Sequence, residues 1–208
     1  MRIDGKGLLD PNDVVTFRFD GQHYKGRRGD TLASALLAND VRLIARSFKY
    51  HRPRGVLTAG SEEPNGLVTL GYGGEQDPNV RATVQEIYEL LEARSQNAWP
   101  SLRRDAMAVN DFLSPFFSAG FYYKTFMWPA KFWEKLYEPV IRHAAGLGPL
   151  SGKPNSDVYE SAFAQCDLLV IGSGPAGLMS ALVAGRAGLD VILAEQDHAL
   201  GGRLLSET

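Results

Sequence analysis

The stretch CDLLVIGSGPAGLMSALVAGRAGLDVILAEQD, from Cys166 to Asp197, predicts a strand, a glycine-rich turn, a helix and a second strand. Residues 167–171 are an almost wholly apolar run, as expected of a parallel strand that is covered on both faces. Gly172, Gly174 and Gly177 follow at once in the spacing G-x-G-x-x-G. In this motif the first glycine permits a tight turn, the second lets the backbone approach a pyrophosphate, and the third lets the helix pack close to the strand.

The residues after the first glycine strengthen the prediction of a dinucleotide site. Ser173 lies inside the turn, and Pro175 and Ala176 open a helix whose free backbone N–H groups and dipole face the phosphate. The run DVILAE is the second strand, and Glu195 stands at its carboxyl end, ~20 residues past the glycines, where a carboxylate accepts hydrogen bonds from ribose hydroxyls. Because an acid there repels a 2′-phosphate, NAD or FAD is favoured over NADP.

A second glycine pair extends the predicted site. The GGRL run at residues 201–204 is typical of the FAD-type branch of this fold, in which a second glycine pair approaches the nucleotide. The predicted cofactor-binding residues are Gly172, Ser173, Gly174, Pro175, Ala176, Gly177, Glu195, Gln196, Gly202 and Arg203. The alternative is a turn that uses its glycines only for packing. Cys166 is expected to be a small buried residue rather than a redox thiol, and no catalytic residue is predicted.

Composition argues against several classes of function. The 208 residues hold 22 Lys and Arg against 24 Asp and Glu, so neither nucleic acid nor an anionic membrane is expected as a partner. One cysteine excludes an intrachain disulfide and any iron–sulfur site made only of this chain's cysteines, and no metal site is expected. The polar first residues lack a signal-peptide core, and no apolar run reaches the ~18 residues of a membrane span. We therefore expect a cytoplasmic protein.

A small α+β domain of the β-grasp type is expected over residues 10–95. In VVTFRF, residues 14–19, every second side chain is apolar, and Asp20-Gly21 follows where a tight hairpin turns into the return strand HYKGR. Asp30 or Thr31 then caps a short helix that ends at Asn39-Asp40.

Two further strands are expected later in this domain. They are GLVTL, residues 66–70, and NVRATVQEIY, residues 79–88, separated by a glycine-rich turn. A hairpin, a helix and later strands in this order are the elements of a β-grasp.

Residues 96–160 are predicted to be an aromatic-rich connector, and residues 161–208 the start of the dinucleotide-binding domain. The connector's large rings are expected to be buried. They either wrap one domain onto another or form a surface for a partner subunit, because large exposed apolar patches are rare on monomers.

Several of these runs resemble the N-terminal region of the alpha subunit of heterotetrameric sarcosine oxidase. The similar runs are SFKYHRPRGVLTAGSEEPNGLV, QNAWPSL, FYYKTFMWP, YEPVIRHAAGLG and CDLLVIGSGPAGL. The resemblance implies a reaction that oxidatively demethylates sarcosine to glycine, with hydrogen peroxide formed from oxygen and the methyl carbon passed to tetrahydrofolate. It also implies that the beta subunit carries the flavin chemistry, while alpha holds NAD in its Rossmann-type domain, with FAD as the alternative.

The resemblance also implies partners, which are the beta, gamma and delta subunits or a C-terminal part of alpha that includes its folate domain. The sequence ends soon after the second predicted strand, so the chain by itself is not expected to be catalytic. The other hypothesis is a subunit-docking module whose nucleotide half-site stays empty.

The β-grasp resembles a [2Fe–2S] ferredoxin domain, whose cluster cysteines lie in the loop that here reads TAGSEEPNG, residues 58–66. Threonine, serine and glutamate stand where thiolates are required, so we expect no iron–sulfur cluster. The predicted fold class is therefore an α+β β-grasp, ferredoxin-like and cluster-free, followed by the first βαβ part of an α/β Rossmann-type FAD/NAD-binding domain.

A cluster of possible cations lies just before that loop, in KYHRPRG. It consists of Lys49, His51, Arg52 and Arg54. These residues form either an anion or interdomain contact, or a solvated, salt-bridged loop, and the second is the commoner case.

Overall fold

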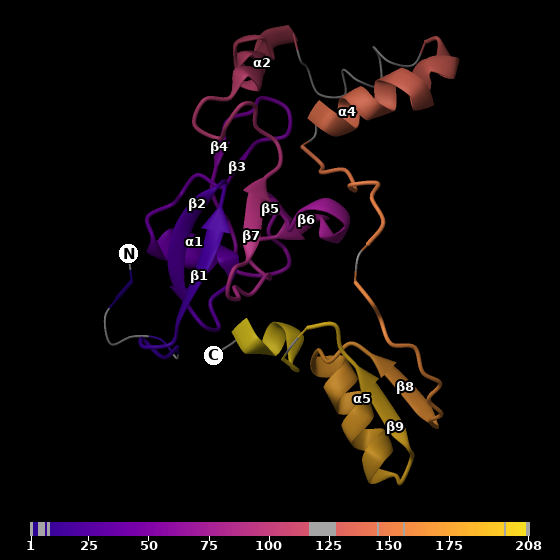
Figure 1. Cartoon of the computed structure of the whole chain (residues 1–208). Coiled ribbons are helices and arrows are strands. Elements are labelled where there is room, and N and C mark those ends of the chain that lie inside the picture. Colours follow the sequence, from indigo (N-terminus) through magenta and orange to yellow (C-terminus); the bar gives the residue numbers. More distant parts are fainter. Residues whose placement is uncertain are drawn as a thin grey trace. The chain divides into compact units, whose positions relative to one another are not determined.

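The computed structural model describes residues 2–3, 7, 9–116, 128–144, 146–155, 157–197 and 199–206. The chain divides into two compact units, Met1–Ser156 and Asp157–Thr208, each with its own sheet (Figure 1).

The first unit is built on a five-stranded mixed sheet in the order β2-β1-β7-β5-β6 (Figure 1). Its strands are β1 (Val14–Phe19), β2 (Gln22–Arg27), β5 (Leu67–Leu70), β6 (Asp77–Arg81) and β7 (Glu92–Ser95). β1 and β7 are parallel, and the other neighbouring pairs are antiparallel. A mixed sheet with one helix is the α+β arrangement that the sequence predicts.

The first hairpin is confirmed. Asp20 and Gly21 both have positive φ, 48° and 79°, which is the backbone of a two-residue turn matched to the twist of the strands it joins. The turn sets the register, in which Phe17 lies opposite Tyr24. Val15, Phe17 and Phe19 are buried on one face of β1, and their burial supplies much of the core.

Helix α1 (Leu32–Ala38) begins and ends where its sequence predicts. The Thr31 hydroxyl accepts the Ser34 N–H at 3.2 Å, which caps the first turn. The Asn39 side chain closes the last turn, since its amide donates to the carbonyl of Ala35 at 2.8 Å and to that of Lys25 in β2 at 2.7 Å. The buried face of the helix therefore packs against the sheet with both of its ends tied.

The later strands differ from the prediction. The strand expected over residues 79–88 ends at Arg81, because the carbonyls of Ala82 and Gln85 accept N–H groups from the start of α1 and do not pair with a strand. β7, in the middle of the sheet, was not predicted. Its sequence EARS holds one buried apolar residue, Ala93, so its strand conformation comes from pairing with β1 and β5 rather than from its own pattern.

The connector consists of short helical pieces. They are α2 (Val109–Phe112), α4 (Glu138–Ala144), 3-10 turns at Ala106–Ala108, Ser114–Phe116 and Ala130–Phe132, and a π-helical turn at Trp133–Tyr137. The expectation that its large rings are buried is wrong for the described Trp99, Phe112 and Trp128, which are 69%, 85% and 83% exposed. The FYYKTFM part of the run lies outside the described residues. The exposed rings make these segments apolar at the surface.

The second unit is a strand–turn–helix–strand, as predicted. β8 (Leu168–Ile171) and β9 (Val191–Ala194) pair in parallel, and α5 (Pro175–Arg186) connects them (Figure 1). The expectation that β8 is covered on both faces is wrong for the described residues, since the side chain of Ile171 is 82% exposed. One helix can cover only one face of a two-stranded sheet, so the other face is left to solvent.

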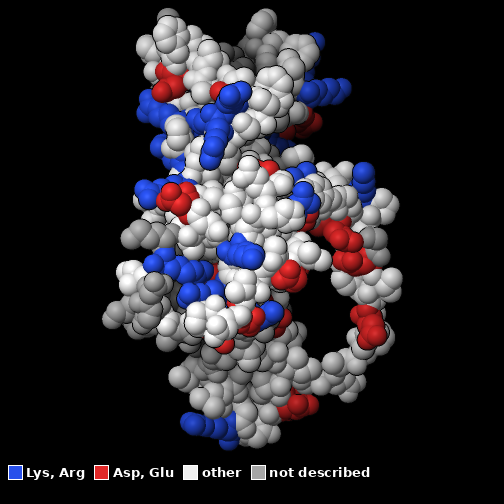
Figure 2. All heavy atoms as spheres, turned by 60° about the vertical axis from the view of Figure 1, so that its left-hand side comes forward, with Lys and Arg blue, Asp and Glu red and all other residues white. Residues whose placement is uncertain are grey.

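Charges of both signs share the face drawn in Figure 2, in keeping with the small net charge. Within the described part of the chain, no helix has both the length and the apolar character that crossing a bilayer requires.

The core of the first unit can be tested with two adjacent leucines of α1. Leu36→Ala is expected to lower the free energy of unfolding by about 2–5 kcal/mol, because Leu36 is fully buried. Leu37→Ala, at a side chain that is 40% exposed, is the matched control and is expected to change it by less than about 0.5 kcal/mol. Urea unfolding of both variants measures the difference, and equal losses would contradict the described packing.

Candidate functional site

The glycine-rich turn leads from β8 into α5 by a backbone that only glycine adopts easily. Gly172 has φ +92°, and its N–H donates to the carbonyl of Ala194 at 2.8 Å, which ties the turn to the end of β9. A Cβ on Gly177 would lie 1.9 Å from the carbonyl oxygen of Gly172. The first and third glycines therefore allow the close approach of helix and strand.

The amino end of α5 is open to a ligand. Gly174 precedes the helix with extended backbone, and a Cβ there would meet nothing within 4 Å. Pro175 is the first helical residue, followed by Ala176, and no described side chain caps this end. The unpaired N–H groups and the positive end of the helix dipole therefore face open space, which suits a phosphate.

Glu195 lies directly after β9 and is held by four donors. Its Oε2 accepts the backbone N–H of Ser173 at 2.7 Å and the Ser173 hydroxyl at 2.6 Å. Its Oε1 accepts the N–H groups of Gln196 at 2.8 Å and Asp197 at 3.1 Å. The Ser173 hydroxyl, and then these backbone groups, lower the pKa of Glu195 to about 2, so the carboxylate is ionised at neutral pH.

The four donors fill the hydrogen-bonding positions of the Glu195 carboxylate. A carboxylate offers about four lone-pair positions, so the protein itself already uses those of Glu195. A ribose hydroxyl must therefore replace or share one of the donors. Three of the donors are backbone N–H groups, and the fourth is the side-chain hydroxyl of Ser173.

The second glycine pair is seated against the same turn. Ser173 is fully buried, and its hydroxyl oxygen accepts the N–H of Gly201 at 3.1 Å. A Cβ on Gly202 would lie 3.3 Å from the Cα of Gly174. The side chain of Arg203 lies outside what the structure describes, and that of Gln196 is exposed. The structure thus brings the turn, Glu195 and Gly202 together.

In the first unit, acidic side chains contact two of the four possible cations. The ring of His51 is buried, and its Nδ1 lies 2.7 Å from Oδ2 of Asp105. The Arg52 guanidinium pairs with Asp111 at 2.7 Å. Both partners lie more than 50 residues further along the chain, so the sequence alone could not show them. For Arg52 the salt-bridged interpretation is the correct one, and His51 is held in a buried contact with Asp105.

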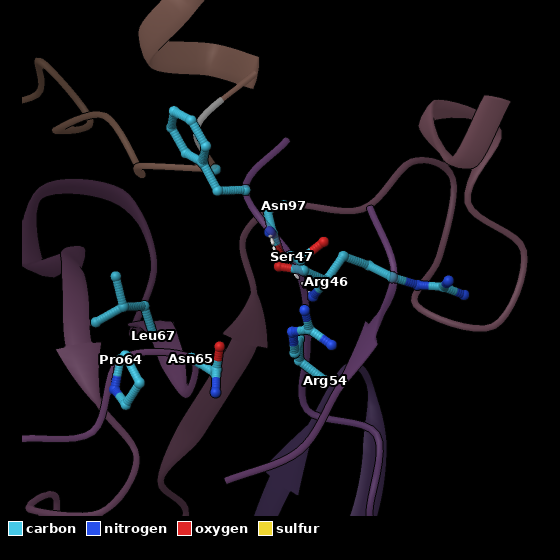
Figure 3. Close-up of a pocket in the computed structure, with 9 residues that line it drawn as sticks. Arg46, Ser47, Arg54, Pro64, Asn65, Leu67 and Asn97 are labelled. Carbon is cyan, nitrogen blue, oxygen red and sulfur yellow. Dashed lines mark hydrogen bonds between the residues drawn. The ribbon is translucent and has the colours of Figure 1, made fainter. Parts of the chain in front are cut away.

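Arg54 lines a pocket of about 260 Å³ in the first unit (Figure 3). Arg46 also belongs to the wall, but its guanidinium is engaged by the carbonyls of Leu102 and His51. The side chain of Arg54 has no hydrogen-bond partner among the described residues. The remaining wall residues are Ser47, Phe48, Pro64, Asn65, Leu67, Asn97 and Gly146.

Comparisons with known families agree with this division of the chain. The family described as a 2Fe-2S iron-sulfur cluster binding domain matches residues 12–98, and the family described as FAD dependent oxidoreductase matches residues 167–208. The chain thus combines a ferredoxin-like domain with a short FAD-oxidoreductase segment.

Individual relatives identify the chain more narrowly than the two broad families do. The chain is 63% identical to sarcosine oxidase subunit alpha of Rhizobium meliloti (strain 1021), over 100% of this chain and 21% of the relative. It is 29% identical to sarcosine oxidase subunit alpha of Corynebacterium sp. (strain U-96), over 94% of this chain and 16% of the relative. The chain is therefore a homologue of sarcosine oxidase subunit alpha and spans about a fifth of the length of the Rhizobium relative.

A solved structure, L-proline dehydrogenase from P. horikoshii, matches with 18% identity and a TM-score of 0.40, over 93% of this chain and 26% of that chain.

The residues of the ferredoxin-like domain do not fit a [2Fe–2S] cluster. Such clusters are held by four cysteine thiolates, or by two with two histidines, and residues 12–98 contain no cysteine. The chain's one cysteine, Cys166, lies in the second unit and is only partly buried. The described residues also include no group of three or more His, Cys, Asp or Glu arranged around a metal position.

The close packing of the glycine turn can be tested on α5. Gly177→Ala is expected to destabilise the second unit by about 1–3 kcal/mol, because its Cβ would overlap the Gly172 carbonyl. Gly185→Ala, in the same helix with nothing within 4 Å, is the matched control and is expected to stabilise the helix by up to about 1 kcal/mol. Amide hydrogen exchange of α5 measures both, and equal protection in the two variants would contradict the described approach.

Proposed function

We propose that this chain contributes a dinucleotide half-site to a sarcosine oxidase complex, with NAD as the nucleotide and FAD as the alternative. The observation that carries the proposal is the single assembly formed by the glycine turn, the open end of α5 and the ionised Glu195. The homology to sarcosine oxidase subunit alpha supplies the kind of complex. The FAD-oxidoreductase match supports a nucleotide site and keeps FAD as a candidate.

The pyrophosphate is proposed to lie at the amino end of α5. The proposed phosphate donors are the backbone N–H groups at the amino end of α5, those of Gly174, Ala176 and Gly177. Gly172, with its positive φ, gives the turn its shape. Because a Cβ on Gly174 would project into open space, the missing side chain leaves room for the phosphates. The nucleotide, when bound, supplies hydride or electron transfer, and this chain's residues bind and orient it.

The adenosine ribose is proposed to bind at Glu195. Its hydroxyls would donate to Oε2 after the Ser173 hydroxyl rotates away, while the backbone donors keep the carboxylate in place. Gln196, Gly202 and Arg203 complete the proposed rim of the site, with Gly202 nearest to the turn.

The reaction of the complex is proposed to be the oxidative demethylation of sarcosine to glycine, with hydrogen peroxide formed and tetrahydrofolate as the one-carbon acceptor. The proposed partners are the beta, gamma and delta subunits or the remainder of an alpha subunit. A dinucleotide spans two βαβ halves, and the second unit described holds one. The 208-residue chain by itself is therefore expected not to oxidise sarcosine.

A second candidate function is a subunit-docking module whose half-site stays empty. It is favoured by apolar side chains that the described residues leave exposed, among them Phe112, Trp128 and Ile171. The two candidates differ in whether a nucleotide is bound in the assembled complex.

Nucleotide titration of the assembled complex tests the proposal. Glu195→Gln is expected to weaken binding by about 10- to 100-fold, because it removes a charged acceptor from the ribose. Ser173→Ala is expected to tighten binding by up to about tenfold, because it frees an acceptor position on Oε2. Ser180→Ala removes a hydroxyl that bonds only the Ala176 carbonyl on the exposed side of α5, and is the control.

Opposite signs for the first two variants distinguish ribose binding from a structural role. If Glu195→Gln leaves affinity unchanged, Glu195 is not in the site, and if Ser173→Ala weakens binding, the serine does not compete with the ribose. The 208-residue chain by itself is expected to bind NAD or FAD more weakly than micromolar, and tighter binding would show that one βαβ half suffices.

A further inference from the structure

We infer that the buried carboxylate of Glu63 takes the place of an iron–sulfur cluster as the anion that holds the loop at residues 57–66 together. The loop belongs to the range that matches the cluster-binding family, and the ferredoxin resemblance implies that cluster cysteines would lie in it. Since that range has no cysteine, its inward N–H groups need another acceptor. Loops around iron–sulfur clusters and phosphates are concavities of N–H groups that require an anion.

Glu63 supplies that anion from within the loop. Its Oε2 accepts the N–H groups of Leu57 at 2.6 Å and Thr58 at 2.7 Å, together with the Thr58 hydroxyl at 3.3 Å. Its Oε1 accepts the N–H of Asn65 at 2.8 Å. One carboxylate therefore joins the start of the loop to its end, as a central cluster would.

The carboxylate is buried without a cation. Glu63 is 1% exposed, and none of the ion pairs among the described residues includes it. An unpaired buried carboxylate is costly unless hydrogen bonds satisfy it. Burial raises the pKa of Glu63, but the N–H groups of Thr58, Asn65 and Leu57 together lower it by more than burial raises it. The pKa of Glu63 therefore lies below its ordinary value.

The last residue of β6 and the two residues after it bond to the carbonyls of the same loop. The guanidinium of Arg81 donates to the carbonyl of Glu63 at 3.2 Å, and the N–H of Ala82 donates to that of Gly66 at 2.8 Å. The Thr83 hydroxyl donates to the carbonyl of Gly60 at 2.7 Å. Three of the loop's carbonyls thus accept hydrogen bonds from residues 81–83, while several of its N–H groups donate to the carboxylate.

This arrangement gives the loop a further role in the pocket of Figure 3. Pro64 and Asn65, the two residues that follow Glu63, form part of the pocket wall. The bond from the N–H of Asn65 to Glu63 fixes that part of the wall opposite Arg54. In the ferredoxin-like domain, the Glu63 carboxylate therefore also helps to shape the pocket that Arg54 lines.

The test compares Glu63→Gln with Glu62→Gln, its exposed neighbour, in the 208-residue chain. Glu63→Gln is expected to speed amide exchange at Leu57, Thr58 and Asn65 by about tenfold or more, because an amide oxygen is a weaker acceptor and its NH₂ has no acceptor there. Glu62→Gln is expected to leave exchange at these amides unchanged. Equal exchange in both variants would overturn the inference.

A second arm of the test does not require a variant to fold. The purified wild-type chain is incubated with ferric iron and sulfide, and its visible absorption and bound iron are measured. No cluster absorption and no stoichiometric iron are expected, because residues 12–98 contain no thiolate and the Glu63 carboxylate already accepts the loop's N–H groups. A cluster formed in the wild-type chain would overturn the inference.

Discussion

A carboxylate that collects backbone N–H groups organises each of the two loops on which the chain's functional features depend. Glu63 does so in the ferredoxin-like domain, and Glu195 does so beside the glycine turn. The donors to Glu63 come from the start and the end of one loop, and those to Glu195 come from two loops, the glycine turn and the residues after β9. In both cases one side chain fixes backbone that lies outside the strands and helices. Hydrogen bonds to an ionised acceptor are the stronger kind, and they rigidify these loops.

The two carboxylates differ in what they leave for a ligand. Glu63 is buried, and its oxygens accept hydrogen bonds from its own loop. We infer that this carboxylate stabilises the loop in a domain that matches the cluster-binding family but has no cysteine. Glu195 is partly exposed, and one of its four donors is a side-chain hydroxyl, that of Ser173. The first loop is enclosed, whereas the second lies beside the open end of α5; under the proposed function, a loop already ordered in this way lowers the ordering cost of binding a nucleotide.

Local sequence patterns predict the parts of the molecule whose causes are local. The Asp20-Gly21 turn, the Thr31 cap and the Gly172–Gly177 turn each depend on residues within a few positions of one another. β7 could not be predicted in this way, because its strand conformation depends on partners about 25 and 75 residues away, in β5 and β1. The same reason hides the His51–Asp105 pair, whose members are 54 residues apart.

The site itself shows the same division. The spacing of the glycines and the position of Glu195 are visible in the sequence. That Ser173 donates to Glu195, and that the carboxylate's capacity is already used, depends on a bond across 22 residues and appears only in three dimensions.

The most direct test of this account is a pH titration of the glutamate side-chain carboxyl groups of the 208-residue chain by ¹³C NMR. The account predicts that Glu195 titrates near pH 2 and that Glu63 titrates below the ordinary value of 4.5. Because both pKa values are depressed in the folded chain, both carboxylates stabilise it above pH 4.5, and this stabilisation is lost as the pH falls through their folded values. Titration of both groups at or above pH 4.5 in the folded chain would contradict the claim that backbone N–H groups hold them.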